Sequence, residues 1–187
     1  MNQVASPMQL RMSMLRWGLF FVPLVVLLGF ASGRLVGSGD SNPWFAMLTK
    51  PEAQPPGWVF PVAWATLYIL MGLAITIIFC ARGARLRPIA MLLFAVQFLL
   101  NLFWPIYFFG MHQVSGGFLL LVALFAVAFA TTLVFGRVRK LAAWLMVPYL
   151  AWLCFAAILN KQIDELNPDA EALVPSKGQT ISIPLAS

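Results

Sequence analysis

Charged residues are scarce in this chain, and no acidic residue lies inside a long apolar segment. Of the 187 residues, 10% are charged and 61% are hydrophobic, whereas soluble domains have about 25% and about 45–50%. All six carboxylates fall in one loop or in the C-terminal tail. The composition excludes an ordinary soluble domain. The lack of a buried acid paired with a base argues against acid–base catalysis and proton-coupled transport.

Cysteine and histidine are also rare. Cys80 and Cys154 both lie inside apolar segments, so we expect neither a disulfide framework nor a metal site with recognisable spacing. His112 is the only histidine. A single histidine in a short loop is a weak basis for haem ligation, so we predict no metal ligand and no required cofactor.

The chain does have five long apolar segments. About 20 helical residues, rising 1.5 Å each, cross a hydrocarbon core of roughly 30 Å. We therefore predict an all-α integral membrane protein with five transmembrane helices in a single bundle. The predicted spans cover about residues 16–36, 58–81, 88–109, 116–136 and 141–160.

Three polar stretches flank or connect these spans. Residues 1–15 are predicted to form a polar leader, and residues 161–187 a polar tail that is mobile beyond Asn167. Residues 37–57 are predicted to form a loop of about 20 residues, and loops of this length are usually either functional or disordered. Trp44 within it favours a lid that packs against the bundle. A cleavable signal peptide is the competing interpretation of the first span, although the apolar run continues well past the small residues of a possible cleavage site.

The twelve lysines and arginines are divided unevenly between the two ends of the spans. Eight lie before the first span, after the second or after the fourth, and four lie on the other side. We interpret the net charge of +6 as an orientation signal rather than a nucleic-acid surface. The positive-inside rule predicts an N-terminus inside, and a lid loop and C-terminus outside, a membrane that we expect to be bacterial. No internal repeat is present, which disfavours a repeat-based transporter.

The third span carries a stripe of polar and aromatic side chains on one helical face. Its members are Gln97, Asn101, Trp104 and Phe108. Residues at this spacing share one face of a helix. Amides in hydrocarbon are expected to face the bundle interior, where they either fix helix packing or line a pocket. The sequence leaves both interpretations open.

Trp64, Trp104 and Trp152 lie several residues inside their spans. Each large indole therefore needs small neighbours or must border a cavity. Three indoles around one cavity would suit an aromatic or tetrapyrrole ligand. Neighbouring stripe positions on the second and fifth spans are Tyr68, Tyr149, Ala156 and Asn160. Tryptophans near span ends are expected in the interfacial belt, namely Trp17, Trp58 and Trp144.

Three long motifs follow one another along the chain. They are WFAMLTKPEAQPPGWVFPVAWATLYILMGLA from Trp44, QFLLNLFWPIYFFG from Gln97 and WLMVPYLAWLCFAAILNKQIDELN from Trp144. Over about residues 17–167 the chain resembles the translocator proteins or tryptophan-rich sensory proteins, the TspO/MBR family or peripheral-type benzodiazepine receptors. The resemblance implies a five-helix membrane bundle, often a homodimer. It also implies a pocket under the first loop that binds porphyrins, haem and synthetic aromatic ligands.

The resemblance also implies roles for individual positions. It places Trp64 and Trp152 at two tryptophans implicated in porphyrin binding and in slow oxidative porphyrin breakdown. Further lining positions that it implies are Asn101, Trp104, Ala156 and Leu159. The family's sterol motif is missing, because AILNKQIDELN after Ala156 has no tyrosine followed by a basic residue. Its absence lowers the expectation of sterol recognition.

Three functions stay open at this point. The first is a membrane sensor or receptor that binds porphyrin or haem and regulates the tetrapyrrole level. The second is a light- and oxygen-dependent porphyrin-degrading enzyme with Trp64 and Trp152 as redox partners, and the third is a facilitator of porphyrin or sterol transport. The candidate ligand-binding residues are Trp44, Trp64, Tyr68, Gln97, Asn101, Trp104, Phe108, Tyr149, Trp152, Ala156 and Leu159.

Overall fold

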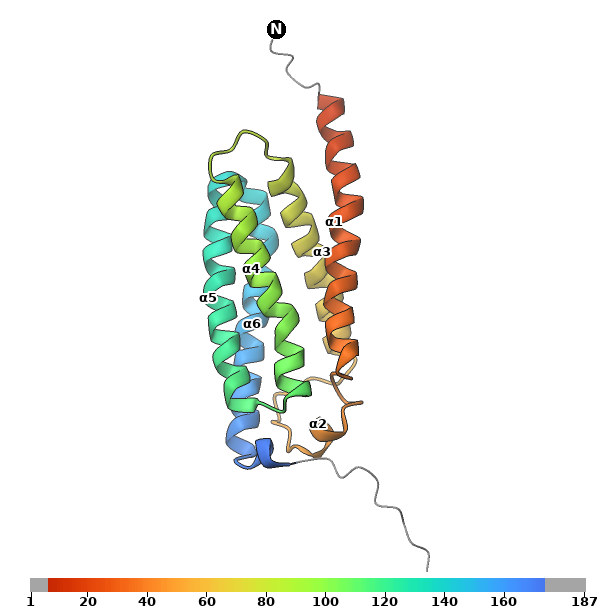
Figure 1. Ribbon diagram of the computed structural model, residues 1–187, viewed down its shortest axis with the longest axis vertical. Coiled ribbons are helices and arrows are strands. Elements are labelled where there is room, and N and C mark those ends of the chain that lie inside the picture. The colour runs from red at the N-terminus through yellow and green to blue at the C-terminus, as the bar shows by residue number, and fades with distance from the viewer. Residues whose placement is uncertain (1–6, 174–187) are drawn as a thin grey trace, which may run out of the picture.

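The computed structural model describes residues 7–173, which contain helices and loops and no strand (Figure 1). Five helices are long and apolar enough to cross a membrane, which confirms the predicted all-α architecture with five spans. The elements in chain order are α1 (Pro7–Leu35), α2 (Pro43–Met47), α3 (Val59–Cys80), α4 (Arg87–Pro105), the π-helical turn η1 (Ile106–Gly110), α5 (Val114–Val138), α6 (Lys140–Leu166) and the 3₁₀ turn η2 (Ala170–Ala172).

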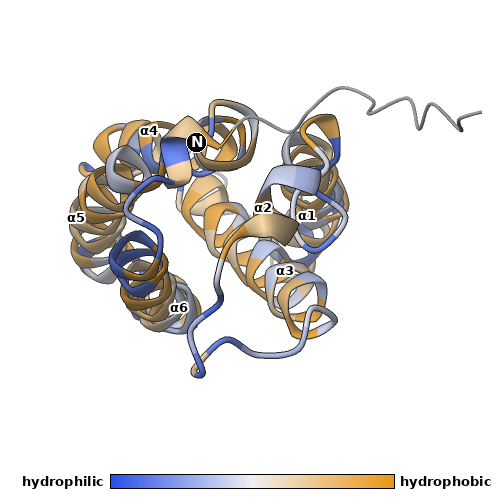
Figure 2. Ribbon diagram, turned by 90° about the horizontal axis from the view of Figure 1, so that it is seen from below, coloured by the Kyte–Doolittle hydropathy of each residue, from blue (hydrophilic) through white to orange (hydrophobic). Residues whose placement is uncertain are grey.

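The five long helices form a ring when they are viewed along their axes (Figure 2). Around this ring, α1 contacts α3, α3 contacts α6, α6 contacts α5, α5 contacts α4, and α4 returns to α1. Ile78 and Leu124 are among the fully buried side chains of the core. Leu27, Leu99 and Leu119 are each at least 65% exposed on the outside. An apolar outer surface is expected where the surrounding solvent is lipid.

Helix α3 begins at Val59, one residue after the predicted start of its span. Pro55 and Pro56 precede it, and proline offers no amide for an intrahelical hydrogen bond. The amide of Val59 donates to the carbonyl of Pro56 at 2.9 Å. Pro61 lies in the first turn, where the missing amide would have had no intrahelical acceptor. The prolines therefore fix where the lid loop ends and the span begins.

Helix α1 starts earlier than the sequence analysis predicted. It begins at Pro7, so residues 7–15 of the predicted polar leader are helical. No glycine or proline occurs between Pro7 and Trp17, so nothing in this segment stops the helix, and its apolar part is long enough to count from Arg11 as a candidate membrane span. Figure 1 shows this end of α1 extending beyond its neighbours. Residues 1–6 of the predicted leader lie outside the described residues.

The predicted boundary at Asn160 is also not a helix end. Helix α6 continues to Leu166, because most of residues 161–166 are good helix formers and none of them is glycine or proline. Lys161 supports this last part with ion pairs to Asp164 at 3.7 Å and Glu165 at 3.6 Å. Within residues 168–173, for which mobility is predicted, Ala170 is 1% exposed and packs in one cluster with Trp44 and Phe45 of the lid loop. The predicted mobility of residues 174–187 falls outside the described residues.

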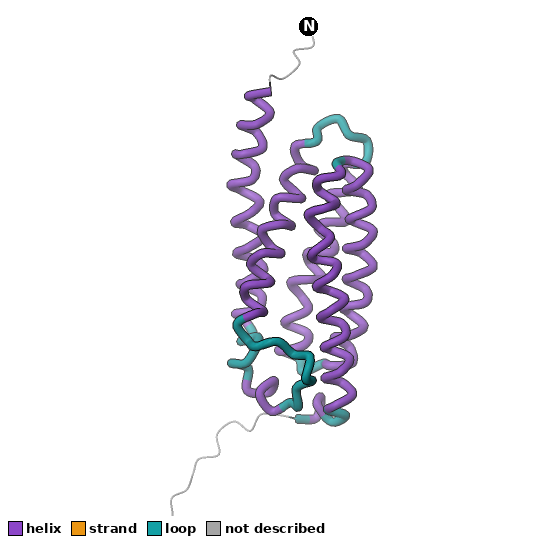
Figure 3. The backbone as a smooth tube through the Cα atoms, turned by 180° about the vertical axis from the view of Figure 1, so that it is seen from behind, coloured by secondary structure: helices purple, strands orange, loops and turns teal. Residues whose placement is uncertain are grey.

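Charge is separated between the two ends of the bundle. The end that holds the α3–α4 and α5–α6 connections (Figure 1) carries eight cations and no carboxylate among the described residues. These cations are Arg11, Arg16, Arg82, Arg85, Arg87, Arg137, Arg139 and Lys140. The opposite end holds the lid loop, the η1–α5 connection and η2 (Figure 3). All six carboxylates lie in the lid loop, at the end of α6 or in the C-terminal segment after it.

Candidate functional site

A cavity of about 790 Å³ lies inside the helix ring, toward the end covered by the lid loop. All five long helices and the lid loop contribute to its wall. Eight of the eleven candidate residues line it: Trp64, Tyr68, Asn101, Trp104, Phe108, Trp152, Ala156 and Leu159. Residues far apart in the sequence are therefore brought to one concave surface.

One wall consists of aromatic rings from α3 and α6. The rings of Trp64 and Tyr68 are stacked, with centroids 5.3 Å apart and planes at 26°. Trp152 approaches Trp64 edge to face, at 6.3 Å and 80°. Phe60 meets Trp152 at 5.9 Å in a similar edge-to-face arrangement. Such contacts are favourable aromatic geometries, and together they make a flat, rigid and largely apolar wall.

A second aromatic pair comes from the end of α4. Trp104 and Phe108 are stacked at 5.0 Å with planes 14° apart. The indole Nε1–H of Trp104 donates to the carbonyl of Gly117 on α5 at 3.1 Å, which fixes the ring orientation. In the sequence, Pro105 follows Trp104 and ends α4, and the backbone continues as the π-helical turn η1, which contains Phe108. Proline removes an intrahelical hydrogen bond, and π-helical turns occur frequently at functional sites.

Asn101 links the cavity to the core behind it. The hydroxyl of Tyr68 donates to Asn101 Oδ1 at 3.3 Å, and Asn101 Nδ2 donates to the hydroxyl of Tyr149 at 3.2 Å. Both polar atoms of Asn101 are thus engaged with protein. We infer that Asn101 mainly positions Tyr68 against the cavity. Gly29 makes room for that ring, because a Cβ at Gly29 would lie 2.3 Å from two of its carbon atoms.

Three candidate residues do not line the cavity. Gln97 and Tyr149 are fully buried in the packing behind the wall, where Gln97 Nε2 lies 3.9 Å from the sulfur of Met71. Trp44 is also fully buried, between the lid loop and the C-terminal segment. A helical stripe identifies a face but gives no position along the helix axis. Gln97 therefore serves packing and Asn101, one turn later, reaches the cavity.

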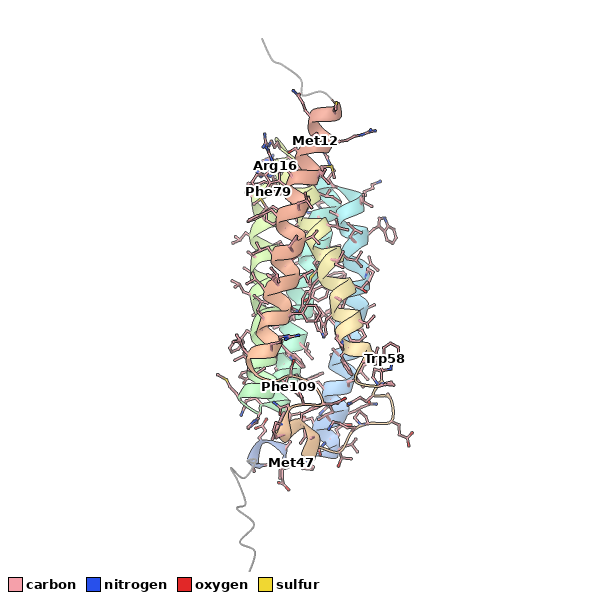
Figure 4. All side chains as sticks on the ribbon, turned by 90° about the vertical axis from the view of Figure 1, so that its right-hand side faces the viewer. Met12, Arg16, Met47, Trp58, Phe79 and Phe109 are labelled. Carbon is pink, nitrogen blue, oxygen red and sulfur yellow. The ribbon has the colours of Figure 1, made fainter. Side chains whose placement is uncertain are left out.

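Asn42, the residue that caps α2, also holds the lid loop against the bundle. Asn42 Oδ1 accepts a hydrogen bond from the amide of Phe45 at 3.0 Å and so caps α2. Its Nδ2 donates to the carbonyl of Val36 at 3.1 Å and to that of Phe109 at 3.4 Å. One amide side chain thus ties α2 to the end of α1 and to η1. Figure 4 shows Phe109 at this end of the bundle, with Trp58 directed away from it.

The C-terminal segment fastens the other side of the lid loop. Asn167 Nδ2 donates to the carbonyl of Thr49 at 2.9 Å, and Asn167 Oδ1 accepts from the Thr49 amide at 2.7 Å. The indole of Trp44 donates to the carbonyl of Ala170 at 2.8 Å and stacks on His112 at 4.7 Å. The sequence offered no signal for this docking, because it joins segments more than a hundred residues apart.

Lys50 folds back onto the end of α2 within the lid loop. Its ammonium group donates to the carbonyls of Phe45 and Leu48, the latter at 3.1 Å, and lies 4.1 Å from the ring centroid of Phe45. Burial lowers the pKa of Lys50, while the negative charge of Asp40 raises it and offsets part of this effect. The partly desolvated ammonium group of Lys50 thus stabilises the lid loop through hydrogen bonds to two of its backbone carbonyls.

Several lining residues were not among the candidates. Arg34 and Asp40 bring charge to the lid end of the cavity, and Asn160 brings an amide from α6. Asn160 follows Ala156 by four residues on one helical stripe, which was the available signal. His112 lies under the lid loop rather than in the cavity wall. No group of three or more metal-ligating side chains occurs among residues 7–173.

Comparison with known proteins finds extensive similarity. The family described as TspO/MBR matches residues 21–166. Protein CrtK of Rhodobacter capsulatus is 40% identical over 139 residues, which are 74% of this chain and 85% of the relative. Tryptophan-rich protein TspO of Chlorobaculum tepidum is 37% identical over 148 residues, 79% of this chain and 93% of the relative. Translocator protein of Homo sapiens is 36% identical over 148 residues, which are 74% of this chain and 88% of the relative.

Proposed function

The chain belongs to the TspO/MBR family of membrane proteins, and from this we propose that it is a receptor that binds tetrapyrroles such as porphyrin and haem. It would sense or regulate their level from a pocket within the membrane. The observation that carries the proposal is the aromatic cavity under the lid loop. Its volume of about 790 Å³ falls within the roughly 300–1,000 Å³ typical of small-molecule sites.

The chemistry of the wall supports a flat ligand. Trp64, Trp152 and Trp104 offer broad ring faces and edges from three helices. Aromatic rings favour offset stacking and edge-to-face contacts with other rings, so a planar macrocycle can contact several of them at once. The small side chain of Ala156 leaves space beside Trp152 on α6.

The lid end of the cavity supports a ligand with carboxylates. Arg34 lines this end, and its guanidinium group forms no hydrogen bond or ion pair with another residue of the described part of the chain. Its guanidinium group can therefore pair with a carboxylate in bidentate geometry. Porphyrins and haem carry propionates on one edge, so the macrocycle would lie against the indoles with its acidic edge toward Arg34.

The separation of charge supports one orientation in the membrane. Eight cations gather at the end opposite the lid loop. The positive-inside rule then places that end and the N-terminus inside, and the lid loop outside. In this orientation a ligand reaches the cavity from outside when the lid loop moves. We extend the proposal to a homodimer, because the outer helix faces are apolar and can pair as well as contact lipid.

Titration of the purified protein with protoporphyrin IX tests the proposal. Quenching of tryptophan fluorescence should saturate at a defined stoichiometry. The double substitution Trp64→Phe and Trp152→Phe should weaken binding at least ~10-fold, because it removes two indole contacts. Trp144→Phe is the matched control, since Trp144 is 70% exposed and lies outside the cavity wall. Equal affinity of the double variant and the control would refute binding at this wall.

Light-dependent oxidative breakdown of the bound porphyrin by O₂ is a second candidate function. It is favoured by the direct contact between Trp64 and Trp152, because two adjacent indoles would both touch the ligand. Illuminated samples in air should lose the porphyrin Soret band faster with the protein than with protein-free bilayers. Loss at the same rate in both samples would leave only the receptor function.

A further inference from the structure

Asn160 is a buried amide with no protein partner. It lies on α6, lines the cavity and is only 3% exposed. Neither its Oδ1 nor its Nδ2 has a hydrogen-bond partner among the described residues. Buried side-chain amides are normally paired, because leaving them unpaired in an apolar environment is unfavourable. Packing within the protein therefore does not explain why an amide occupies position 160.

The two amides in the cavity wall differ in this respect. Asn101 is engaged through both of its polar atoms, with Tyr68 and Tyr149. Asn160 has its full hydrogen-bonding capacity left over.

The surroundings hold the Asn160 amide beside a flat surface. A Cβ at Gly117 would lie 3.1 Å from Asn160 Nδ2 and 3.0 Å from Cδ2 of Phe108, so all three residues meet at one place. Phe108 is stacked on Trp104. The Oδ1 and Nδ2 atoms of Asn160 each expose less than 1 Å², so the amide has to rotate toward the cavity to meet the edge of a planar ligand that lies along this aromatic pair.

We propose that Asn160 determines specificity by pairing with a neutral cis-amide edge of the ligand. The inference rests on the proposed function, in that flat ligands bind in this cavity. A side-chain amide presents one donor and one acceptor side by side. Its complement is a group with N–H and C=O on adjacent atoms of one ring, as in a lactam. A carboxylate anion fits less well, because its second oxygen would face the oxygen of Asn160.

A pair of matched probes tests this proposal. Phenanthridinone is a flat three-ring lactam, and N-methylphenanthridinone has the same ring system with a methyl group in place of the donor hydrogen. Affinities for the full-length protein are measured by tryptophan quenching, and protoporphyrin IX is titrated in parallel. The lactam should bind at least ~10-fold more tightly than the methylated probe, the ratio expected for about one lost hydrogen bond with an unpaired partner.

Asn160→Leu and Asn160→Ala should abolish this preference and bind both probes within about twofold of each other, which is near the precision of such free energies. Protoporphyrin binding reports whether each variant retains its cavity. Gln97→Leu is the matched control, because Gln97 is a fully buried amide that does not line the cavity. It should keep the preference.

The outcomes separate this inference from the function on which it rests. Equal binding of the two probes to the unchanged protein, or an undiminished preference in both Asn160 variants, overturns the role of Asn160 and leaves the receptor function standing. If neither the probes nor protoporphyrin bind to the unchanged protein, the receptor function fails and the inference fails with it. A preference that is lost in the Asn160 variants and kept in Gln97→Leu supports it.

Discussion

Asn167 holds Thr49 by both backbone groups, donating to its carbonyl at 2.9 Å and accepting from its amide at 2.7 Å. The side-chain amide thereby supplies the donor and the acceptor that a neighbouring backbone would otherwise offer to Thr49. Asn167 follows the last residue of α6, and α6 also carries Trp152 and Ala156 in the cavity wall. The lid loop is thus fastened to the same helix that forms part of the pocket beneath it.

Asn167→Ala should loosen the lid loop. The change removes the two hydrogen bonds to Thr49 and a third to the carbonyl of Ile163, and is expected to cost about 1–2 kcal/mol of local stability. Hydrogen exchange of residues 43–49 should become faster, and protoporphyrin should dissociate faster. Glu165→Ala is the control, because its carboxylate is 63% exposed and makes only a surface ion pair. Unchanged exchange in Asn167→Ala would show that the contact does not hold the lid loop.

Gly29→Ala should narrow the cavity. The added methyl group would lie 2.3 Å from ring carbons of Tyr68, so the ring must move, and Tyr68 lines the cavity. We expect protoporphyrin affinity to fall about 10-fold, in line with the ~1–3 kcal/mol cost of overpacking. Gly18→Ala on the same helix is the control, since its nearest contact would be an ordinary 3.8 Å. Equal affinity of the two variants would contradict the prediction.

Arg34→Gln should weaken binding of protoporphyrin IX several-fold. Charge-assisted bonds to carboxylates contribute about 1.5–3 kcal/mol when they are shielded and less when they are exposed. The dimethyl ester of protoporphyrin IX lacks both carboxylates, so its affinity should not respond. Arg137→Gln, at the opposite end of the bundle, is the control. A similar loss for the acid and the ester would mean that Arg34 acts through packing rather than charge.

Alkaline pH should stabilise the folded lid loop through Lys50. Burial lowers the pKa of Lys50 in the folded protein, so the unfolded state binds more protons between the lowered pKa and the ordinary value of 10.5. Stability should therefore rise with pH in this interval. Thermal unfolding of the protein is compared with that of Lys50→Met, and the stability of the unchanged protein should rise relative to that of the variant with increasing pH only in this interval. Lys161→Met is the control, because that lysine is half exposed.

The sequence predicted the membrane architecture well because lipid imposes simple demands. A spanning helix must be long and apolar, and this is visible as five uninterrupted segments. Helix ends are less visible, since hydropathy marks the membrane boundary and not the end of the hydrogen-bonded helix. For this reason α1 begins at Pro7 rather than at residue 16, and α6 ends at Leu166 rather than at Asn160.

The cavity wall was predictable where a large aromatic residue lay inside a span. Trp64, Trp104 and Trp152 all line it, because an indole packs poorly in a ring of helices unless it borders a space. The stripe on α4 could not distinguish the packing residue Gln97 from the lining residue Asn101. The burial of Trp44 depends on the C-terminal segment, and no local pattern in the sequence reports that long-range contact.

The uneven charge of the bundle ends has a kinetic consequence for ligand entry. Among the described residues, the lid end carries six carboxylates but only Arg34, Lys50 and Lys161 as cations. A dianionic porphyrin approaching this end meets a repulsive potential until it reaches Arg34. Repulsion between like charges is screened by salt. Its association rate should therefore increase with ionic strength, whereas that of an uncharged ester should stay constant.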